Sequence, residues 1–208
     1  MEATLLVVLG WLLGIVGGPI AERIRRKYSA NDLKKACLNE LLNFRYSMAS
    51  LVQLVHSKMG TLNHEILDWV EPIEQHYQGP DKDPLALTVV QKLKALPPTE
   101  LEGAMAIKKA QFSAMTAKQY SLSFIDSQMA SLSILPIDLR LRILQVKDQL
   151  AIFNQDVTFV NSQLALTYQN LGSNRGAVVQ TLTDGYQTLA SRARQIADAI
   201  TAISDRYS

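Results

Sequence analysis

The chain has 208 residues, of which 21 are Lys or Arg and 19 are Asp or Glu, which leaves a formal net charge of +2. One cysteine and three histidines rule out an internal disulfide and argue against a zinc site built from Cys and His. The nearly balanced charge argues against a protein that binds nucleic acid over a broad surface.

The first element predicted along the chain is a single transmembrane helix. Residues 3–21 carry no charge, and nineteen helical residues span about 28 Å, close to the hydrocarbon thickness of a bilayer. A cleaved signal peptide fits less well, because no basic residue precedes the run and Pro19 and Ile20 stand where small residues are needed. A buried core helix also fits less well, because the run has no polar stripe.

A basic cluster follows this predicted span directly. Residues 22–35 contain six bases and two acids, whereas residues 36–208 contain 15 bases and 16 acids. Because Lys and Arg stay on the cytoplasmic side of membrane helices, we expect the N-terminus outside and the body in the cytoplasm. The body has no second basic cluster, so no nucleic acid partner is predicted. The bases nearest the span are expected to contact anionic lipid headgroups: Arg23, Arg25, Arg26 and Lys27.

Three glycines recur at every fourth position of the predicted span, namely Gly10, Gly14 and Gly18. Residues at that spacing share one helix face, and small residues there let two membrane helices approach closely. The pattern predicts association of two spans. The alternative is that glycine is simply frequent in membrane helices, with Pro19 marking a kink.

After an anchor in residues 1–27, residues 28–208 are predicted to form an all-α cytoplasmic domain. Apolar residues recur at spacings of three and four in four long segments separated by Gly and Pro, and no alternating strand pattern is present. Such segments predict an elongated antiparallel bundle of the four-helix type. A small helical insert is expected at about residues 61–96, with a bend or break near Pro72. The four long segments cover residues 31–58, 99–131, 138–171 and 174–207.

The motifs of phosphate-binding loops, nucleophile elbows, zinc proteases and calcium loops are missing from the sequence. No enzymatic activity and no cofactor are predicted. One cluster of side chains has two interpretations. His64, Asp68 and Glu71 would share one face of a helix and could bind a divalent ion. The alternative, which we favour, is a solvated face opposite an apolar stripe.

The single cysteine, Cys37, has two interpretations. Its closeness to the predicted membrane and to basic residues is typical of a lipidation site. Its place on the apolar face of the first body helix instead indicates a buried thiol, which is the interpretation we favour.

The last two long segments are rich in amides and poor in charge, which is typical of helices that pack against another protein. Together with the span, this predicts a single-pass, membrane-anchored helical adaptor or scaffold that acts through protein contacts or self-assembly. The alternative is a membrane-active effector or signal transducer whose glycine-faced span oligomerises. The amides concerned include Gln145, Gln149, Asn154, Gln155, Asn161 and Gln163 of the third segment.

Overall fold

The computed structural model describes residues 2–79, 82–110, 114–168 and 175–207, and the side chains of residues 2–27 and 175 lie outside that description. The described residues form helices and connecting segments, with no strand among them. The all-helical class predicted from the sequence is confirmed. In chain order the helices are α1 (Glu2–Met59), α2 (His64–His76), α3 (Ala86–Lys94), α4 (Pro98–Ala110), α5 (Ser123–Ser127), the 3-10 turn η1 (Ser131–Ile134), α6 (Ile137–Thr167) and α7 (Arg175–Tyr207).

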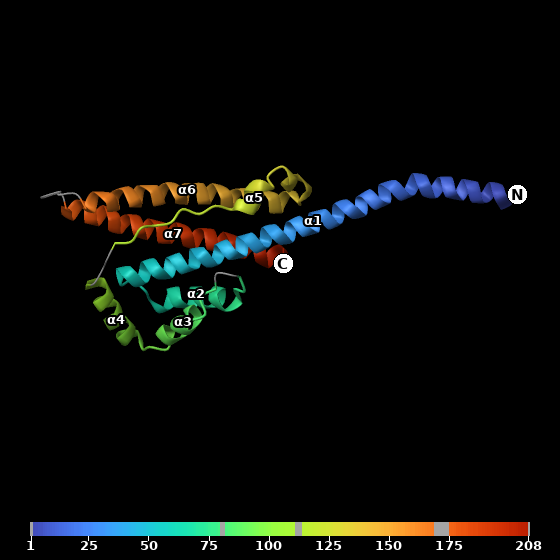
Figure 1. Ribbon diagram of the computed structural model, residues 1–208. Coiled ribbons are helices and arrows are strands. Elements are labelled where there is room, and N and C mark those ends of the chain that lie inside the picture. The colour runs from blue at the N-terminus through green and yellow to red at the C-terminus, as the bar shows by residue number, and fades with distance from the viewer. Residues whose placement is uncertain (1, 80–81, 111–113, 169–174, 208) are drawn as a thin grey trace.

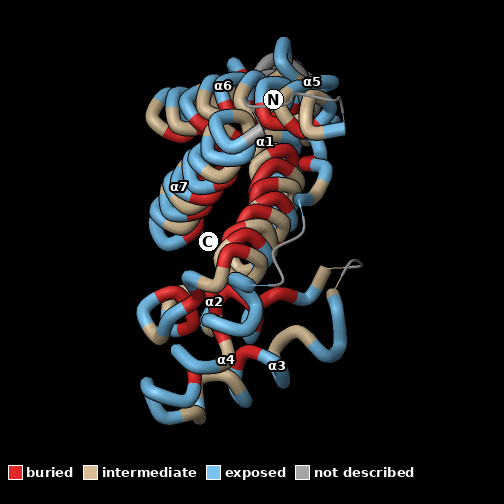
Figure 2. The backbone as a smooth tube through the Cα atoms, turned by 90° about the vertical axis from the view of Figure 1, so that its left-hand side faces the viewer, coloured by how far each residue is buried: buried red, intermediate tan, exposed pale blue. Residues whose placement is uncertain are grey.

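Three long helices, α1, α6 and α7, form the bundle (Figure 1). The helix α7 packs against both α1 and α6 and runs opposite to them, while the N-terminal part of α1 extends beyond the other helices (Figure 1). Buried residues line the sides of these helices that face one another (Figure 2). The helical bundle expected from the apolar spacings is therefore present, with three long helices in place of four.

The apolar rows predicted for the three long helices are the buried rows of the structure. Each row follows the three- and four-residue spacing that keeps side chains on one helix face. On α6 every member of the row is 7 % exposed or less: Leu139, Ile143, Val146, Leu150, Phe153, Val157, Val160 and Leu164.

The predicted long helix over residues 99–131 is wrong beyond Ala110, because α4 ends there and residues 114–122 are not helical. That segment returns along the bundle from the α4 end to α5 (Figure 1). Nine extended residues reach about 30 Å, whereas nine helical residues reach about 14 Å, so the extended conformation lets the segment run about twice as far along the bundle. Tyr120 of the segment lies between Phe44 and Phe153, with ring centroids 5.8 Å and 6.1 Å apart.

Side chains, not another strand, satisfy the backbone of this extended segment. Asn161 pairs with Ala117, accepting from its N–H at 2.9 Å and donating to its carbonyl at 2.8 Å. The Tyr186 hydroxyl likewise accepts from the Met115 N–H at 2.9 Å and donates to the Met115 carbonyl. Buried backbone groups need such partners, and here helices α6 and α7 supply them.

The helices α2, α3 and α4 lie along the flank of α1 (Figure 1). Asn63 caps α2, since its Oδ1 accepts from the Ile66 N–H at 3.0 Å. Pro72 lies within α2, which runs from His64 to His76 without a break. The sequence allowed a bend or a break at this proline, and the structure shows no break.

Among the residues whose side chains are described, no helix carries an apolar stretch long enough to cross a membrane. The predicted span, residues 3–21, lies outside those side chains.

Candidate functional site

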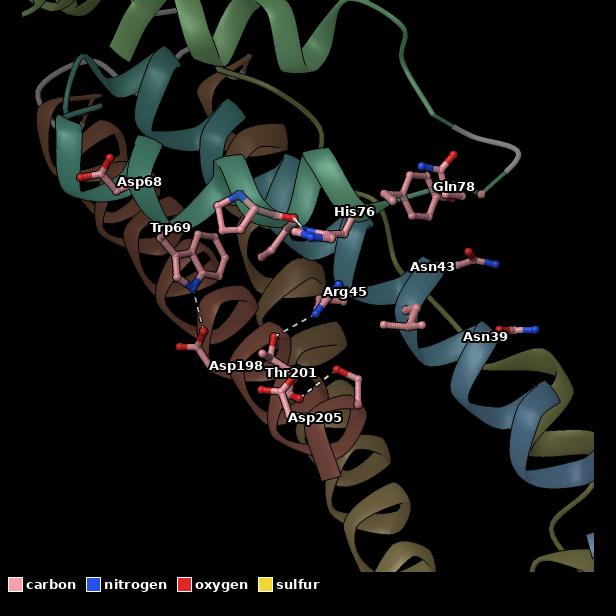
Figure 3. A pocket seen from close by; sticks show the side chains of 16 residues that line it. Asn39, Asn43, Arg45, Asp68, Trp69, His76, Gln78, Asp198, Thr201 and Asp205 are labelled. Atoms are coloured by element: carbon pink, nitrogen blue, oxygen red, sulfur yellow. Dashed lines mark hydrogen bonds between the residues drawn. The ribbon is translucent and has the colours of Figure 1, made fainter. Parts of the chain in front are cut away.

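An open groove of about 990 Å³ lies between α1, α2 and α7 (Figure 3). Its lining combines apolar side chains with amides, hydroxyls, a guanidinium and three carboxylates. Among the lining residues are Leu42, Asn43, Arg45, Asp68, Trp69, Ile73, Asp198, Thr201 and Asp205.

Helix periodicity places each wall of the groove. On α7, Asp198, Thr201 and Asp205 follow one another at spacings of three and four, so they form one row. The row adjoins the buried stripe that includes Ile196, Ile200 and Ile203, and it therefore lies at the edge of the α1–α7 contact. Polar side chains in this row reach the groove while their helix remains fixed by the core.

Trp69 joins α2 to α7 across the groove. Its indole Nε1 donates a hydrogen bond to Asp198 Oδ1 at 2.7 Å (Figure 3). The guanidinium of Arg194 lies over the same ring, 5.4 Å from the centroid, and Arg194 also contacts Glu65 at 3.0 Å. A ring held at its face and at its edge keeps a set orientation, so the apolar wall of the groove is preorganised.

Arg45 of α1 supplies the positive charge of the groove. Its Nη1 donates to Thr201 Oγ1 at 3.4 Å, and its Nε is shielded from solvent without a hydrogen-bond partner. Burial lowers the pKa of the guanidinium, and the charge of Asp205 opposes that effect. The guanidinium thus retains hydrogen-bonding capacity close to Asp205 of α7.

The His64, Asp68 and Glu71 cluster is occupied by a lysine from the neighbouring helix. Lys94 Nζ lies 2.6 Å from Asp68 Oδ1 and 2.7 Å from Glu71 Oε2. His64 Nε2 instead contacts the Leu96 carbonyl oxygen at 3.0 Å. The ammonium group lies where an ion would bridge the carboxylates, and no group of three metal-binding side chains occurs in the described part of the chain. The cluster therefore attaches α3 to α2.

Glu74 is a buried acid of α2 outside the cluster of His64, Asp68 and Glu71. Its side chain is 1 % exposed, and neither carboxylate oxygen has a hydrogen-bond partner. Burial raises the pKa of this carboxyl, Asp83 raises it further, and Lys82 opposes them. Glu74 therefore lies on the buried side of α2, unlike Asp68 of the cluster. A position four residues after Val70, on the buried side of α2, was the available signal.

Cys37 is fully buried in the core of the bundle. Burial, with a smaller contribution from Glu40, raises the pKa of the thiol to about 11. The buried-thiol interpretation is confirmed, and the lipidation interpretation does not fit a thiol without solvent access.

The amides of α6 that the sequence singled out have two different environments. Asn154 and Asn161 bind the backbone of the extended segment, whereas Gln145 and Gln155 lie exposed on the outer side of α6. The residues predicted for membrane association and membrane-surface contact lie outside the described side chains: Gly10, Gly14, Gly18, Arg23, Arg25, Arg26 and Lys27.

No protein-family model matches the chain, and neither the curated proteins nor the solved structures contain a significant match.

Proposed function

We propose that this protein is a membrane-anchored helical adaptor whose groove between α1, α2 and α7 binds a helix of a partner protein. The single observation that carries the proposal is the groove itself, about 990 Å³ in volume and bounded by three helices. A groove lined by both apolar and polar side chains suits an amphipathic helix, which can place its apolar side against Leu42, Trp69 and Ile73 and its polar edges against the carboxylates.

The charges of the groove support a partner helix with basic residues. Asp68, Asp198 and Asp205 line it against one guanidinium, that of Arg45. Asp68 already pairs with Lys94 and Asp198 already accepts from Trp69, so Asp205 is the carboxylate most open to a new cation. Complementary charge at a rim favours correct association and raises the association rate.

The proposed anchor is residues 3–21, on the sequence argument of an uncharged run followed by Arg23, Arg25, Arg26 and Lys27. Its N-terminus faces outward and the bundle lies in the cytoplasm. Sodium carbonate extraction of membranes tests the anchor: the full chain is expected in the pellet, and a variant without residues 1–21 in the supernatant. Recovery of both in the same fraction would contradict the anchor and leave the groove untested by this experiment alone.

The groove is tested by placing a photoreactive p-benzoylphenylalanine at Asn43, an exposed residue of its wall. In native membranes we expect a covalent adduct with one partner protein. Mass spectrometry should locate the crosslink in a basic amphipathic helix of that partner. The adduct should fall strongly when Asp198→Asn and Asp205→Asn are combined. The same photoreactive group at Gln187, an exposed residue of α7 that does not line the groove, is the control. Equal adducts at both positions, or an adduct indifferent to the aspartates, would refute the groove.

A second candidate function is a signal transducer in which the spans associate through Gly10, Gly14 and Gly18. The observation that favours it is that α1 continues from Glu2 to Met59, so the predicted span and the bundle belong to one helix. Replacing residues 1–20 with an unrelated single-pass anchor separates the two functions. An adaptor keeps its activity after this exchange, whereas a transducer loses it.

A further inference from the structure

The helix α6 carries two rows of residues on opposite sides. The inner row is the buried core row from Leu139 to Leu164. An outer row lies two positions later at each step, and a two-residue step turns a helix by about 200°, so the outer row points away from the bundle. Figure 1 shows α6 along one edge of the molecule with no long helix beyond it. The outer row consists of Leu141, Gln145, Asp148, Ile152, Gln155, Phe159, Ser162 and Leu166.

Half of this outer row is apolar, and Asp148 is its one charged residue. Leu141 is 57 % exposed, Ile152 43 % and Phe159 49 %. Eleven residues of α6 are exposed, and Asp148 is the only charged residue among them. Helix faces in contact with water normally carry many charges, so this composition is typical of a face that packs against another helix.

The outer row is also self-complementary. In an antiparallel pair centred on Leu150, Leu141 lies opposite Phe159 of the second copy, Gln145 opposite Gln155, and Asp148 opposite Ile152. The outer layers, Leu141 with Phe159 and Gln145 with Gln155, follow the pattern of antiparallel coiled coils, whereas the two central layers place Asp148 beside Ile152.

The charges at the edge of the same pair are complementary. Arg142 and Asp156 flank the outer row on the side next to α7, and the antiparallel register brings each opposite the other residue of the second copy. Within one chain Arg142 lies 3.7 Å from Asp138, and Asp156 pairs with Arg192. Twofold symmetry repeats the Arg142–Asp156 relation at both ends of the interface.

The available area is that of a small, weak interface. In an antiparallel register centred on Leu150, residues 137–163 of the two copies overlap, a helix length of about 40 Å, so two faces about 10 Å wide bury about 800 Å² together. That area lies below the roughly 1,000 Å² at which stable specific interfaces begin and is typical of a weak pair.

We propose that the outer row of α6 is a homodimer interface, in which α6 of a second copy packs antiparallel and centred on Leu150. The interface is separate from the groove and from the predicted anchor. It therefore persists whether or not either of those proposals holds.

Disulfide trapping tests the register in the full-length chain. Because Cys37 is fully buried, a cysteine introduced on the surface is the reactive thiol of the folded protein. We expect an equimolar mixture of Gln145→Cys and Gln155→Cys chains to form a disulfide-linked heterodimer. Either chain alone should form several-fold less, because identical positions are displaced by ten residues, about 15 Å along the axis, beyond the reach of a disulfide.

A disruptive substitution gives the second measurement. Ile152→Lys is expected to reduce heterodimer trapping at least tenfold, while Leu54→Lys, at a position 46 % exposed on α1, leaves it unchanged. Circular dichroism of both variants establishes that they are folded. Homodimeric disulfides at Gln155→Cys alone would indicate a parallel pair and overturn the proposal. Absence of trapped dimers, or equal effects of the two lysines, would also overturn it.

Discussion

Asn154 of α6 binds Tyr120 by two backbone hydrogen bonds, accepting from its N–H at 3.1 Å and donating to its carbonyl at 2.8 Å. A side-chain amide here takes the place that a neighbouring strand has in a sheet. The same arrangement at Asn161 lies seven residues later, two helical turns along α6. Two asparagines on one helix face thus fix an extended segment to an otherwise helical bundle.

We expect Asn154→Ala to lower the free energy of unfolding by about 1–3 kcal/mol, because two half-buried backbone groups lose their partners. Asn154→Asp should destabilise the protein as well, since a carboxylate cannot donate to the Tyr120 carbonyl. Urea unfolding followed by circular dichroism measures both effects. Gln187→Ala, at an exposed position of α7, is the control and should change stability by no more than about 0.5 kcal/mol. Equal stability of the Asn154 and Gln187 variants would contradict the prediction.

Gly185 of α7 marks a close approach to α6, because a Cβ built there would lie 2.7 Å from Val160 Cγ2. We expect Gly185→Ala to cost about 1–3 kcal/mol through overpacking, although alanine is the better helix former. Gly103→Ala on α4, where nothing lies within 4 Å, should instead gain about 0.5–1 kcal/mol.

The cause of the Gly185 effect is tested by a double-mutant cycle. Val160→Ala removes the atom that the new Cβ meets, so the two substitutions should be coupled by more than about 0.5 kcal/mol in the stabilising direction. Thermal unfolding of the four proteins gives the coupling. Additive effects would show that the contact with Val160 is not the cause.

Glu74 predicts a pH dependence of stability. Because burial raises the pKa of this carboxyl above its ordinary value of 4.5, the folded protein keeps a proton that the unfolded chain releases. Stability therefore falls as the pH rises through 4.5 and stops falling above the raised pKa. Glu74→Gln cannot ionise, and its stability relative to the natural protein should increase between pH 4 and pH 7. Urea unfolding at both pH values measures this difference. Glu100→Gln, at an exposed position of α4, controls for loss of a charge, and a pH-independent difference for Glu74→Gln would refute the prediction.

Cys37 should react only through unfolding. With its thiol buried and its pKa raised to about 11, we expect little modification by a disulfide reagent at pH 8 in the folded protein and complete modification in urea. Between pH 9.0 and about 11 the Cys37 thiol ionises in the unfolded chain but stays protonated in the folded protein. The free energy of unfolding therefore decreases over this range, and protection of the thiol should weaken with it. Rapid labelling of the folded protein would place the thiol at the surface.

Lys94 should control the attachment of α3 to α2. The hydrogen bonds that its ammonium group donates to Asp68 and then to Glu71 raise the pKa of that group, so Lys94→Met leaves two carboxylates next to each other without their cation. Amide hydrogen exchange in residues 86–94 should become faster in this variant, and also in the natural protein at high salt. Lys92→Met, an exposed position of the same helix, is the control. Unchanged exchange after Lys94→Met would show that apolar contacts alone hold α3.

Periodicity predicted the three long helices well because each buries one stripe along its length. The rows through Met48, Phe153 and Ile196 follow the spacing of a helix, and these residues are at most 1 % exposed. The predicted segment that begins at residue 99 likewise agrees with the start of α4, which begins at Pro98.

The end of α4 could not be predicted in the same way. In the sequence, Leu122 and Met129 continue the spacing of an apolar helix face. In the structure, Leu122 belongs to the extended segment and is buried there, whereas Met129 is 41 % exposed. The partners that favour the extended chain, Asn154, Asn161 and Tyr186, come from helices distant in sequence. Local patterns carry no signal of such contacts. The groove escaped prediction for the same reason, because Arg45, Trp69 and Asp198 come from three separate helices.

A strand in a sheet is held by backbone groups, which every amino acid except proline supplies, so only a substitution to proline removes one of its partners. The extended segment after α4 is held by the side chains of Asn154, Asn161 and Tyr186. Each attachment is thus encoded by one codon and is open to loss by point mutation. The path of this segment therefore depends on the sequences of α6 and α7 as much as on its own sequence.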